Sequence, residues 1–508
     1  MKRIMALVLT LALLLSVAPA SLAEAKEPIK LTVFFASTRP QNEYTDMTRQ
    51  YMIDNLGVDV ELIQGDAANI KQQLALLMSS GDMPDIVRVD YDTWREYAAE
   101  GAFADMTPYM DKYPDIKTYV NDDDMWNYMT VNDQVNGVPC MLNVPSSHIS
   151  WIRQDWLDNL GMAVPTTLDE FTEVMRAFTL KDPDGNGKND TYGFSCSTYT
   201  YLDMLLGAFG ASSEDICMLN EDNTITTNAI SEQYRKGLAY LRDCYKEGII
   251  DPELFTCTYE QAQAKWGRGE MGIWGAWWSH SANAYARFGF GELQPEAKVT
   301  AIKPAVGENN QSGVFGTSQI DSVVGVSYLC EGEKLDAAMR LINFQATDYG
   351  FLTVQFGVEN EFFTWDPQTK KITWYWGVDG GKSKSGYEVT DMECYKFLFH
   401  EALQASSYEL GDLEDQKQRV LGSNMRFEEP TYDNLFFYVR SDEYAEYSAE
   451  LKSYFLSSMI SFVMGEKSLE TDWDEYVKTY LEMGGDKVRQ SLLTVYNEMN
   501  GTAYTFAE

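Results

Sequence analysis

Apolar and polar residues near the amino terminus alternate in blocks that predict strands and helices in turn. Residues 31–35 form an unbroken apolar and β-branched run, which is typical of a buried parallel strand. Further strands are predicted at 58–63 and 85–89, with one helix ending near residue 55 and another over 68–79. The β-α-β-α-β order predicts an α/β fold with a parallel sheet covered by helices.

Polar segments follow the first and third of these strands. Ligands of open parallel sheets bind beyond the carboxyl ends of the strands, so both segments are candidate site loops. The candidates are Thr38, Arg39, Gln41 and Asn42 in the first segment, and Asp90, Tyr91, Asp92 and Trp94 in the second. Asp92 is the leading hydroxyl acceptor, and its alternative role is a helix N-cap.

A second helical pattern begins at a capping box formed by Thr167 and Glu170, and its apolar face continues to Phe178. The stretch that closes this helix, D-P-D-G-N-G-K-N-D-T-Y-G, has the spacing of a calcium loop. The candidate ligands at loop positions 1, 3, 5, 7 and 9 are Asp182, Asp184, Asn186, Lys188 through its main-chain carbonyl, and Asp190.

The turn of this loop agrees with calcium, but its end departs from an EF-hand. Gly187 sits at position 6, where the chain must turn sharply. Position 12 is Gly193 instead of a bidentate Glu, so a further ligand must come from elsewhere, from water or from Thr191. We expect a structural Ca²⁺ ion; the alternative is a solvated Asx/Gly turn.

The chain begins with the pattern of an export signal. Lys2 and Arg3 precede an apolar run over residues 5–17, which is too short to span a bilayer comfortably. Small residues follow, with cleavage expected after Ala23 or Ala25. The pattern predicts a signal peptide over residues 1–25 and an exported mature protein; the alternative is an uncleaved membrane anchor.

Composition narrows the function classes. A formal net charge of −37 argues against nucleic acid and anionic lipid as partners. A length of 508 residues is too great for one core and predicts two lobes. Seven cysteines without a C-x-x-C motif and three dispersed histidines show no zinc or redox motif, and they weaken a Ser-His-Asp interpretation.

Several ordered blocks resemble one family. The segments concerned are Met78-Ser-Ser-Gly-Asp-Met-Pro-Asp-Ile86, Ile152-Arg-Gln-Asp-Trp-Leu157, Pro165-Thr-Thr-Leu-Asp-Glu170, the loop at 181–194, Trp266-Gly-Arg-Gly-Glu-Met271, Trp274-Gly-Ala-Trp277, and the Trp473-Asp-Glu-Tyr476 and Met483-Gly-Gly485 blocks. Together they are similar to the family 1 extracellular solute-binding proteins of ABC importers, in the large branch that handles oligosaccharides. The blocks cover most of the mature chain in the family's order.

The resemblance implies that each of two lobes is α/β and that the chain crosses between the lobes more than once. It implies a two-lobed, periplasmic-binding-protein-like clamp with discontinuous lobes and a ligand cleft between them. The expected N-lobe covers 26–145 and 305–349, and the expected C-lobe covers 146–304 and 350–508. Residues 322–327 would return to the N-lobe as a strand, and 374–376 would belong to a hairpin.

Further candidate ligand-binding residues lie in later parts of the chain, and the resemblance selects some of them. Aromatic rings match the apolar faces of sugars, and polar side chains match their hydroxyls. Trp277 and Trp278 match the family's G-x-W region, and one of the pair is expected to be buried. The further candidates are Tyr199 and Tyr201 after a strand at 192–196, and Asn143, Ser146 and Ser147 at the first crossing, with Glu359 and Glu361 as weaker ones.

The implied function is an extracytoplasmic receptor that closes on an oligosaccharide and delivers it to permease subunits served by an ATPase. Gram-positive members of the family carry a lipobox cysteine, whereas the first cysteine here is Cys140, so the usual lipid anchor is not expected. We expect a monomer without catalytic residues. The alternatives are a secreted glycoside hydrolase and a sugar-binding surface protein that does not serve transport.

Overall fold

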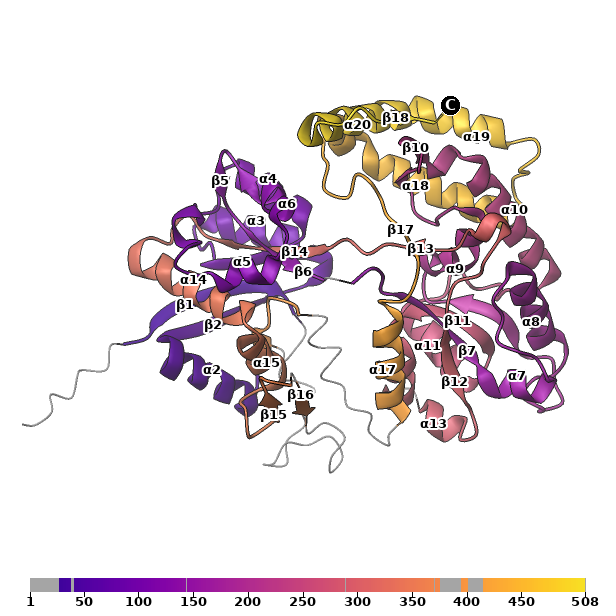
Figure 1. Cartoon of the computed structure of the whole chain (residues 1–508), viewed down its shortest axis with the longest axis horizontal. Helices are drawn as coiled ribbons and strands as arrows, with labels where there is room; N and C mark the ends of the chain where they lie inside the picture. The colour runs from indigo at the N-terminus through magenta and orange to yellow at the C-terminus, as the bar shows by residue number, and fades with distance from the viewer. Residues whose placement is uncertain are drawn as a thin grey trace, which may run out of the picture. The chain divides into compact units, whose positions relative to one another are not determined.

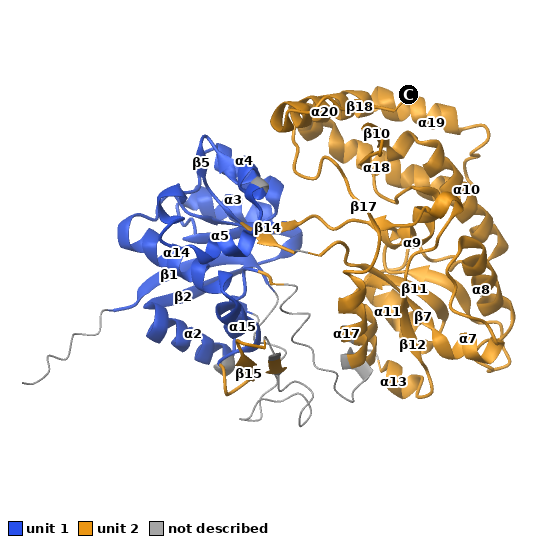
Figure 2. Ribbon diagram, viewed as in Figure 1, with its two compact units in different colours: residues 1–138, 322–358, 390–398 blue, residues 139–321, 359–389, 399–508 orange. Residues whose placement is uncertain are grey.

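The chain divides into two compact units, and each unit is built from segments that are not contiguous in the sequence. The computed structural model describes residues 27–37, 41–142, 144–287, 289–369, 371–374, 394–400 and 414–507. Unit 1 comprises residues 1–138, 322–358 and 390–398, and unit 2 comprises 139–321, 359–389 and 399–508 (Figure 2). The predicted signal peptide, Thr38, Arg39, Asn143, Tyr375 and Trp376 lie outside the described residues.

Unit 1 is built on a five-stranded sheet in the order β2-β1-β3-β14-β6 (Figure 1). Its strands are β1 (Ile29–Ala36), β2 (Val58–Gly65), β3 (Ile86–Val89), β14 (Ile320–Val326) and β6 (Val138–Met141). β1 pairs in parallel with both β2 and β3, whereas β14 pairs antiparallel with β3. The parallel β-α-β-α-β start and the returning strand are therefore confirmed.

Helices cover this sheet because their apolar residues recur on one face. They are α2 (Glu43–Leu56), α3 (Ile70–Ser80), α4 (Tyr91–Ala99), α5 (Asp115–Val120), α6 (Asp123–Tyr128), α14 (Gly332–Ala346) and α15 (Asp348–Phe356). Buried Asp85 ties β1 to the loop before β3, since its Oδ2 accepts from Thr32 N at 2.8 Å and its Oδ1 pairs with Lys334 Nζ at 2.7 Å. This carboxylate gives the Pro-Asp-Ile block a structural role.

Unit 2 contains a four-stranded sheet in the order β12-β7-β11-β8. The strands are β7 (His148–Arg153), β8 (Tyr192–Cys196), β11 (Met271–Trp277) and β12 (Val299–Ile302). β11 runs antiparallel to β7 and parallel to β8, and Trp277 is the register partner of His148. The last residues of β11 and β8 therefore lie at the same edge as the first residue of β7.

Helices and small sheets surround this second sheet (Figure 1). The helices are α7 (Gln154–Leu160), α8 (Leu168–Leu180), α9 (Asp203–Leu206), α10 (Glu232–Glu247), α11 (Tyr259–Arg268), α12 (His280–Arg287), α13 (Phe290–Leu293), α17 (Glu414–Met425), α18 (Asp442–Val463), α19 (Trp473–Tyr480) and α20 (Asp486–Asn500). The short strands are β9 (Cys217–Leu219), β10 (Thr224–Thr227), β13 (Val314–Phe315), β17 (Thr431–Tyr432) and β18 (Thr505–Phe506). The predicted capping box begins α8, because Glu170 N donates to Thr167 Oγ1 and Thr167 N donates to Glu170 Oε2.

The unit boundaries fall within or beside secondary structure. They lie at 138/139 in β6 and 321/322 in β14, compared with the expected 145/146 and 304/305. Unit 1 also includes residues 350–358 and 390–398, which we had expected in the C-lobe. The reason is local packing: α15 follows α14 directly, Gln345 Nε2 of α14 donates to Tyr395 O at 2.9 Å, and Lys396 Nζ donates to Gln355 Oε1 of α15 at 2.7 Å.

Three smaller findings complete the fold. The expected hairpin is formed by β15 (Phe363–Asp366) and β16 (Lys371–Trp374), which pair antiparallel. All seven cysteines lie in described segments as free thiols, and every one except Cys257 is buried. Across the described residues, no helix has both the length and the apolar character needed to cross a membrane.

Candidate functional site

Two of the predicted ligand-binding residues of unit 1 flank the start of α2. Asn42 Oδ1 accepts from Thr45 N at 3.1 Å, and Asn42 N donates to Thr45 Oγ1 at 2.8 Å. This reciprocal pair satisfies main-chain groups at the helix start, so Asn42 has an N-capping role. Gln41, immediately before it, is exposed.

The predicted residues around α4 separate into capping, core and exposed positions. Asp90 caps the helix by accepting from Thr93 N at 2.9 Å, whereas Asp92 lies exposed in the first turn. Tyr91 is buried, and Trp94 is fully buried with its Nε1 donating to Asn136 O at 3.3 Å. Trp94 therefore belongs to the core of unit 1, because its one polar atom already has a partner there.

The aromatic candidates of unit 2 gather at the edge where β8 and β11 end. Trp277 is partly exposed, while Trp278 is 6% exposed and stacks under Arg426, whose guanidinium carbon is 4.2 Å from the ring centroid. Tyr199 and Tyr201 follow β8 in a short 3₁₀ turn. Tyr201 is buried with its ring 4.8 Å from that of His148, and burial raises the pKa of partly buried Tyr199 to about 12.

Partly exposed rings extend from Trp277 into a row that sequence reasoning missed. We call the following residues the aromatic row: Trp277, His148, Phe315, Phe437 and Tyr438. Successive ring centroids along it are 6.4, 6.2, 5.5 and 6.0 Å apart. The row comes from four segments of unit 2, so sequence proximity gave a signal only for His148, which follows the predicted Ser146 and Ser147.

His148 gives this row a polar group without a positive charge. Burial lowers the pKa of His148 to about 4, so its imidazole is neutral at neutral pH. Its Nδ1 is buried and has no hydrogen-bond partner within the described residues. Its main-chain N–H donates to Ser146 Oγ at 3.0 Å, which fixes the start of β7.

Ser146 and Ser147 are themselves buried and have structural bonds. Ser146 Oγ donates to Phe315 O at 3.3 Å, and Ser147 O accepts from Trp278 N at 3.1 Å. The two serines therefore hold β7, β11 and β13 at this edge. The weaker candidate Glu359 forms an isolated bridge with Phe363 beside the β15–β16 hairpin.

A hollow of about 510 Å³ lies at the Tyr438 end of the aromatic row. Its lining residues are Val144, Pro145, Thr317, Gln319, Thr431, Asp433, Phe437 and Tyr438. Carboxylate, amide and hydroxyl groups alternate there with two aromatic rings, a combination suited to a polyhydroxylated ring. Sequence reasoning gave no signal for this hollow, because its residues come from three distant segments.

A second hollow, of about 310 Å³, includes Phe315 and Phe437 in its lining and is charged. Arg440, Lys452 and Arg489 lie there beside Glu214 and Asp215. Burial raises the pKa of Asp215 to about 6, although the Tyr480 hydroxyl donates to its Oδ2 at 2.6 Å. Three basic side chains therefore stand beside two carboxylates at this end of the row, and the raised pKa of Asp215 favours its neutral form.

Ser197 and His280 form a hydroxyl–imidazole contact that bears on catalysis. Ser197 Oγ lies 3.5 Å from His280 Nδ1, but that nitrogen also accepts from Trp277 N at 3.2 Å. Burial lowers the pKa of His280 to about 3. The imidazole is therefore a poor general base, because its acceptor nitrogen is engaged and it takes up a proton only in strong acid.

The predicted calcium loop is a tight turn around converging oxygen atoms. Asn186 Nδ2 donates to Asp184 Oδ2 at 2.7 Å and to Asp190 Oδ1 at 3.1 Å. Gly187, with φ of 78°, donates its N–H to Asp182 Oδ2 at 3.0 Å. Thr191 is directed elsewhere, since its hydroxyl donates to Phe178 O at 2.7 Å.

The electrostatics of the loop favour a cation. Asp182 Oδ1 is buried and has no hydrogen-bond partner in the described part of the chain. Burial raises the pKa of Asp184, and the nearby Asp190 and Asp182 carboxylates raise it too. Nowhere among the described residues do three His, Cys, Asp or Glu side chains stand in ligand geometry, so the loop would have to tighten around an ion.

Comparison with known proteins places these features in a family. The chain is 23% identical to "Lipoprotein LipO" of Bacillus subtilis over 467 residues, which cover 87% of this chain and 86% of that protein. It is 25% identical over 279 residues to "Fructooligosaccharide ABC transporter substrate-binding protein FusA" of Streptococcus pneumoniae, which cover half of each chain (50% and 50%). Both relatives are substrate-binding proteins or lipoproteins by name, and neither is named as an enzyme.

Solved structures share the two-lobed fold. "Alginate-binding protein AlgQ2 without calcium ion" matches with a TM-score of 0.72 and 20% identity, covering 93% of this chain and 98% of that chain. FusA of Streptococcus pneumoniae in complex with kestose matches with a TM-score of 0.70 and 18% identity, covering 93% and 99%. An EF-hand mutant of FusA has also been solved, in complex with fructo-nystose.

The sequence matches the family described as "Bacterial extracellular solute-binding protein" over residues 40–349. This span is more than half of the 508 residues. With the two α/β units described above, it shows that the chain belongs to the bacterial extracellular solute-binding protein family.

Proposed function

We propose that this protein is the substrate-binding receptor of an ABC importer and captures an oligosaccharide outside the membrane. Family membership and the FusA relative support the proposal. The observation that carries it is the aromatic row of unit 2, which leads from Trp277 to the polar hollow at Tyr438. Flat apolar rings beside hydroxyl-binding groups match the faces and edges of a sugar.

Each part of the site has a role in this proposal. The exposed part of the Trp277 ring stacks on the C–H face of one sugar. The next sugar ring enters the hollow, where Asp433 accepts from a hydroxyl. The Gln319 amide nitrogen already donates to Val144 O and Thr317 O, so this side chain offers its amide oxygen as an acceptor. His148 stays neutral above its lowered pKa, so the row places no positive charge beside the ligand.

Hinge closure would couple this site to transport, because the segment that leaves β6 runs beside the segment that enters β14. Leu142 N donates to Gln319 O at 2.9 Å, and Thr317 N donates to Pro145 O at 2.8 Å. The hydroxyl of Tyr438 accepts from Ile320 N at 3.0 Å. A sugar against Tyr438 would therefore touch the chain at the hinge. The bound sugar would favour the closed state through contacts that it makes only in the closed state.

The proposal includes the export signal, the monomeric state and the permease partners that the sequence led us to expect. The receptor is exported by the signal at residues 1–25, acts as a monomer and delivers its ligand to permease subunits driven by an ATPase. The acidic charge of −37 is compatible with a neutral glycan and unfavourable for nucleic acid. The first cysteine, Cys140, is a buried thiol, so membrane retention would not use it as a lipid-bearing residue.

We also propose a structural Ca²⁺ in the loop between α8 and β8. The ligands would be Asp182, Asp184, Asn186 and Asp190 through side-chain oxygens and Lys188 through its carbonyl oxygen. The unpartnered buried Oδ1 of Asp182 supports this. A bound ion would hold the turn closed by giving those carboxylates a common positive charge. It has no role in ligand chemistry.

A secreted glycoside hydrolase is the alternative, and the described site offers it little. Hydrolysis needs two carboxyl groups facing the scissile bond at a fixed separation. Of the aromatic row and the hollow at Tyr438, only Asp433 supplies a carboxylate, and His280 is engaged as an acceptor. Release of reducing ends from a bound oligosaccharide would overturn the receptor proposal in favour of the enzyme.

The proposal is tested by calorimetry on the mature protein with kestose, nystose and oligogalacturonides. We expect one of these classes, or a related glycan added to the series, to bind intact, and Trp277→Ala to weaken it by roughly tenfold or more. Tyr328→Ala is the matched control, since Tyr328 is a 54% exposed ring in unit 1 outside the row. Equal affinity of the Trp277→Ala variant and the wild type would refute the assignment of this site.

A further inference from the structure

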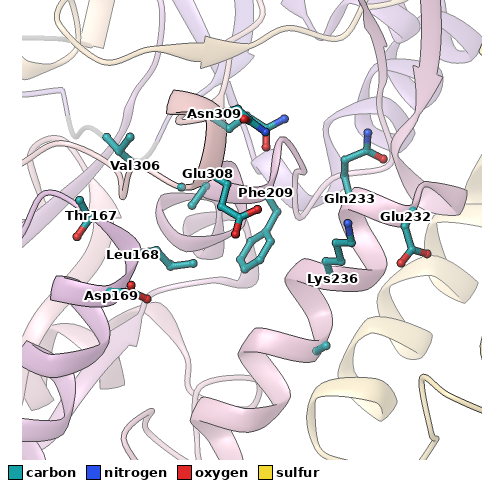
Figure 3. A pocket seen from close by; sticks show the side chains of 14 residues that line it. Thr167, Leu168, Asp169, Phe209, Glu232, Gln233, Lys236, Val306, Glu308 and Asn309 are labelled. Carbon is teal, nitrogen blue, oxygen red and sulfur yellow. The ribbon is translucent and has the colours of Figure 1, made fainter.

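A cavity outside the aromatic row occupies another face of unit 2. Its volume is about 960 Å³, at the upper end of the range of small-molecule sites. Four segments line it: the start of α8, the turn after α9, the first turns of α10, and the loop at 306–311 (Figure 3). None of its lining residues belongs to the aromatic row or to the hollow at Tyr438.

Phe209 is the centre of this cavity. Figure 3 shows its ring between the side chains of Glu308 and Lys236. The ring is partly buried and lies 5.6 Å from that of Tyr240, and a Cβ on Gly237 of α10 would come within ordinary contact distance of it, 3.6 Å from Phe209 Cδ2. The ring is therefore held from behind by α10 while it lines the open cavity.

The walls are fixed by close approaches of main chain. A Cβ on Gly307 would lie 1.8 Å from Ala208 O, so the 306–311 loop sits directly on the turn that carries Phe209. Gly307 N donates to Gln311 O at 2.8 Å, and Asn309 and Asn310 between them are left-handed, with φ of 58° and 59°. The loop thus presents Glu308 and Asn309 to the cavity from a constrained turn.

The lining mixes charges of both signs with amides. Asp169, Glu232 and Glu308 provide carboxylates, and Gln233, Asn309 and Gln311 provide amides. Lys236 makes no ion pair within the described residues, although it shares the cavity with these acids. The three carboxylates outnumber the single ammonium group, so such a lining disfavours a polyanion. A neutral polyol can donate hydroxyls to the first and accept from the second.

We propose that this cavity is a second saccharide-binding site, selective for neutral sugars, with Phe209 as its stacking platform. It goes beyond the receptor site, because it is a separate place on the same unit with its own aromatic ring. Its function would be to hold one part of a long neutral glycan while the aromatic row binds another. Once the glycan is bound at one site, its effective concentration at the other site is raised.

The test uses saturation-transfer NMR on the mature protein with kestose and maltotriose as neutral probes and trigalacturonate as the anionic one. In the Trp277→Ala background, we expect Phe209-dependent saturation transfer to at least one neutral probe and no Phe209-dependent transfer to trigalacturonate. Phe209→Leu keeps the apolar bulk but removes the flat ring, and it should weaken that binding by roughly tenfold. Glu308→Ala and Lys236→Ala, both at exposed positions, test the same site if Phe209→Leu fails to fold.

The outcomes separate this inference from the receptor proposal. Residual binding that is unchanged by Phe209→Leu and by both exposed-site variants overturns the second site, as does the absence of any binding in the Trp277→Ala background. Phe209-dependent binding of trigalacturonate equal to that of the neutral probes overturns its selectivity. If the wild type shows no tight site but keeps Phe209-dependent binding, the receptor proposal fails and the second site stands.

Discussion

The main-chain N–H of Trp277 donates to Nδ1 of His280 at 3.2 Å. His280 is in turn packed edge-on against Tyr259, with ring centroids 4.3 Å apart, and is 8% exposed. The bond spans the turn between the end of β11 and the start of α12. The orientation of the exposed Trp277 ring therefore depends on a buried imidazole three residues later in the chain.

Replacement of His280 tests this dependence. We expect His280→Ala to weaken oligosaccharide binding by roughly tenfold, the equivalent of about 1.4 kcal/mol, because the turn loses its acceptor. His280→Asn offers an amide oxygen at a similar position and should recover most of the affinity. Calorimetry measures both variants, and an equal loss in the two would show that the imidazole matters for packing alone.

The calcium loop predicts a metal-dependent stability of unit 2. A ligand that binds the folded state alone raises stability by mass action, so Ca²⁺ well above its dissociation constant should raise the thermal midpoint by roughly 5 °C relative to EDTA. Asp182→Asn should abolish most of this shift. Lys188→Ala is the control, because that position supplies a main-chain carbonyl; an identical shift in all three proteins contradicts the site.

The buried carboxyl group of Asp203 is expected to make the stability of the folded state depend on pH. Burial raises its pKa to about 7, although Ser212 Oγ and Ser213 N donate to the carboxylate. The folded state thus holds this proton more tightly than the unfolded chain, whose Asp pKa is about 3.9. The stabilisation is complete below about pH 4 and is lost as the pH rises through about 7.

Asp203→Asn removes this titration. We expect the fall in unfolding free energy between about pH 4 and pH 7 to shrink by up to about 4 kcal/mol in the variant. Urea unfolding monitored across that range measures it. Asp92→Asn, at an exposed position of unit 1, is the control for removing one charge, and a matching pH profile for wild type and Asp203→Asn would rule out the buried proton.

Adding a side chain at Gly207 is expected to cause a severe packing defect. A Cβ at this position would lie 1.8 Å from Gly313 O, a main-chain atom that cannot turn away. Gly207→Ala should therefore cost about 3 kcal/mol in unfolding free energy and disturb the β13 strand that carries Phe315. Gly291→Ala meets only ordinary contacts, at 3.5 Å from Tyr285 Cδ1, and should unfold like the wild type in the same denaturant titration.

Local patterns were enough to predict much of unit 1 and the framework of the calcium loop. The strands β1, β2 and β3 could be read from runs of apolar residues, because a buried parallel strand needs them along its whole length. The start of α8 could be read from Thr167 and Glu170, because a capping box joins residues three positions apart. The spacing of Asp182 to Asp190 is likewise contained within one turn of chain.

Assignments that depend on burial could not be made from sequence alone. Asp90 and Asp92 are equivalent in a local pattern, and only the helix register makes Asp90 the cap of α4. Trp94 follows β3 and Trp277 ends β11, yet the first fills the core of unit 1 and the second remains partly exposed. The difference lies in neighbours such as Asn136 that are distant in the chain.

The sequence by itself determined the α/β class and the two-lobed family, and it predicted candidate residues for sugar and calcium. The tertiary structure decided which side chains form the proposed site: it joined Trp277 and His148 by strand register and brought Phe315, Phe437 and Tyr438 beside them. The physical reason is range. Helix caps, turns and metal loops are set by residues within a few positions, whereas a binding surface depends on contacts between segments that meet only when the chain is packed.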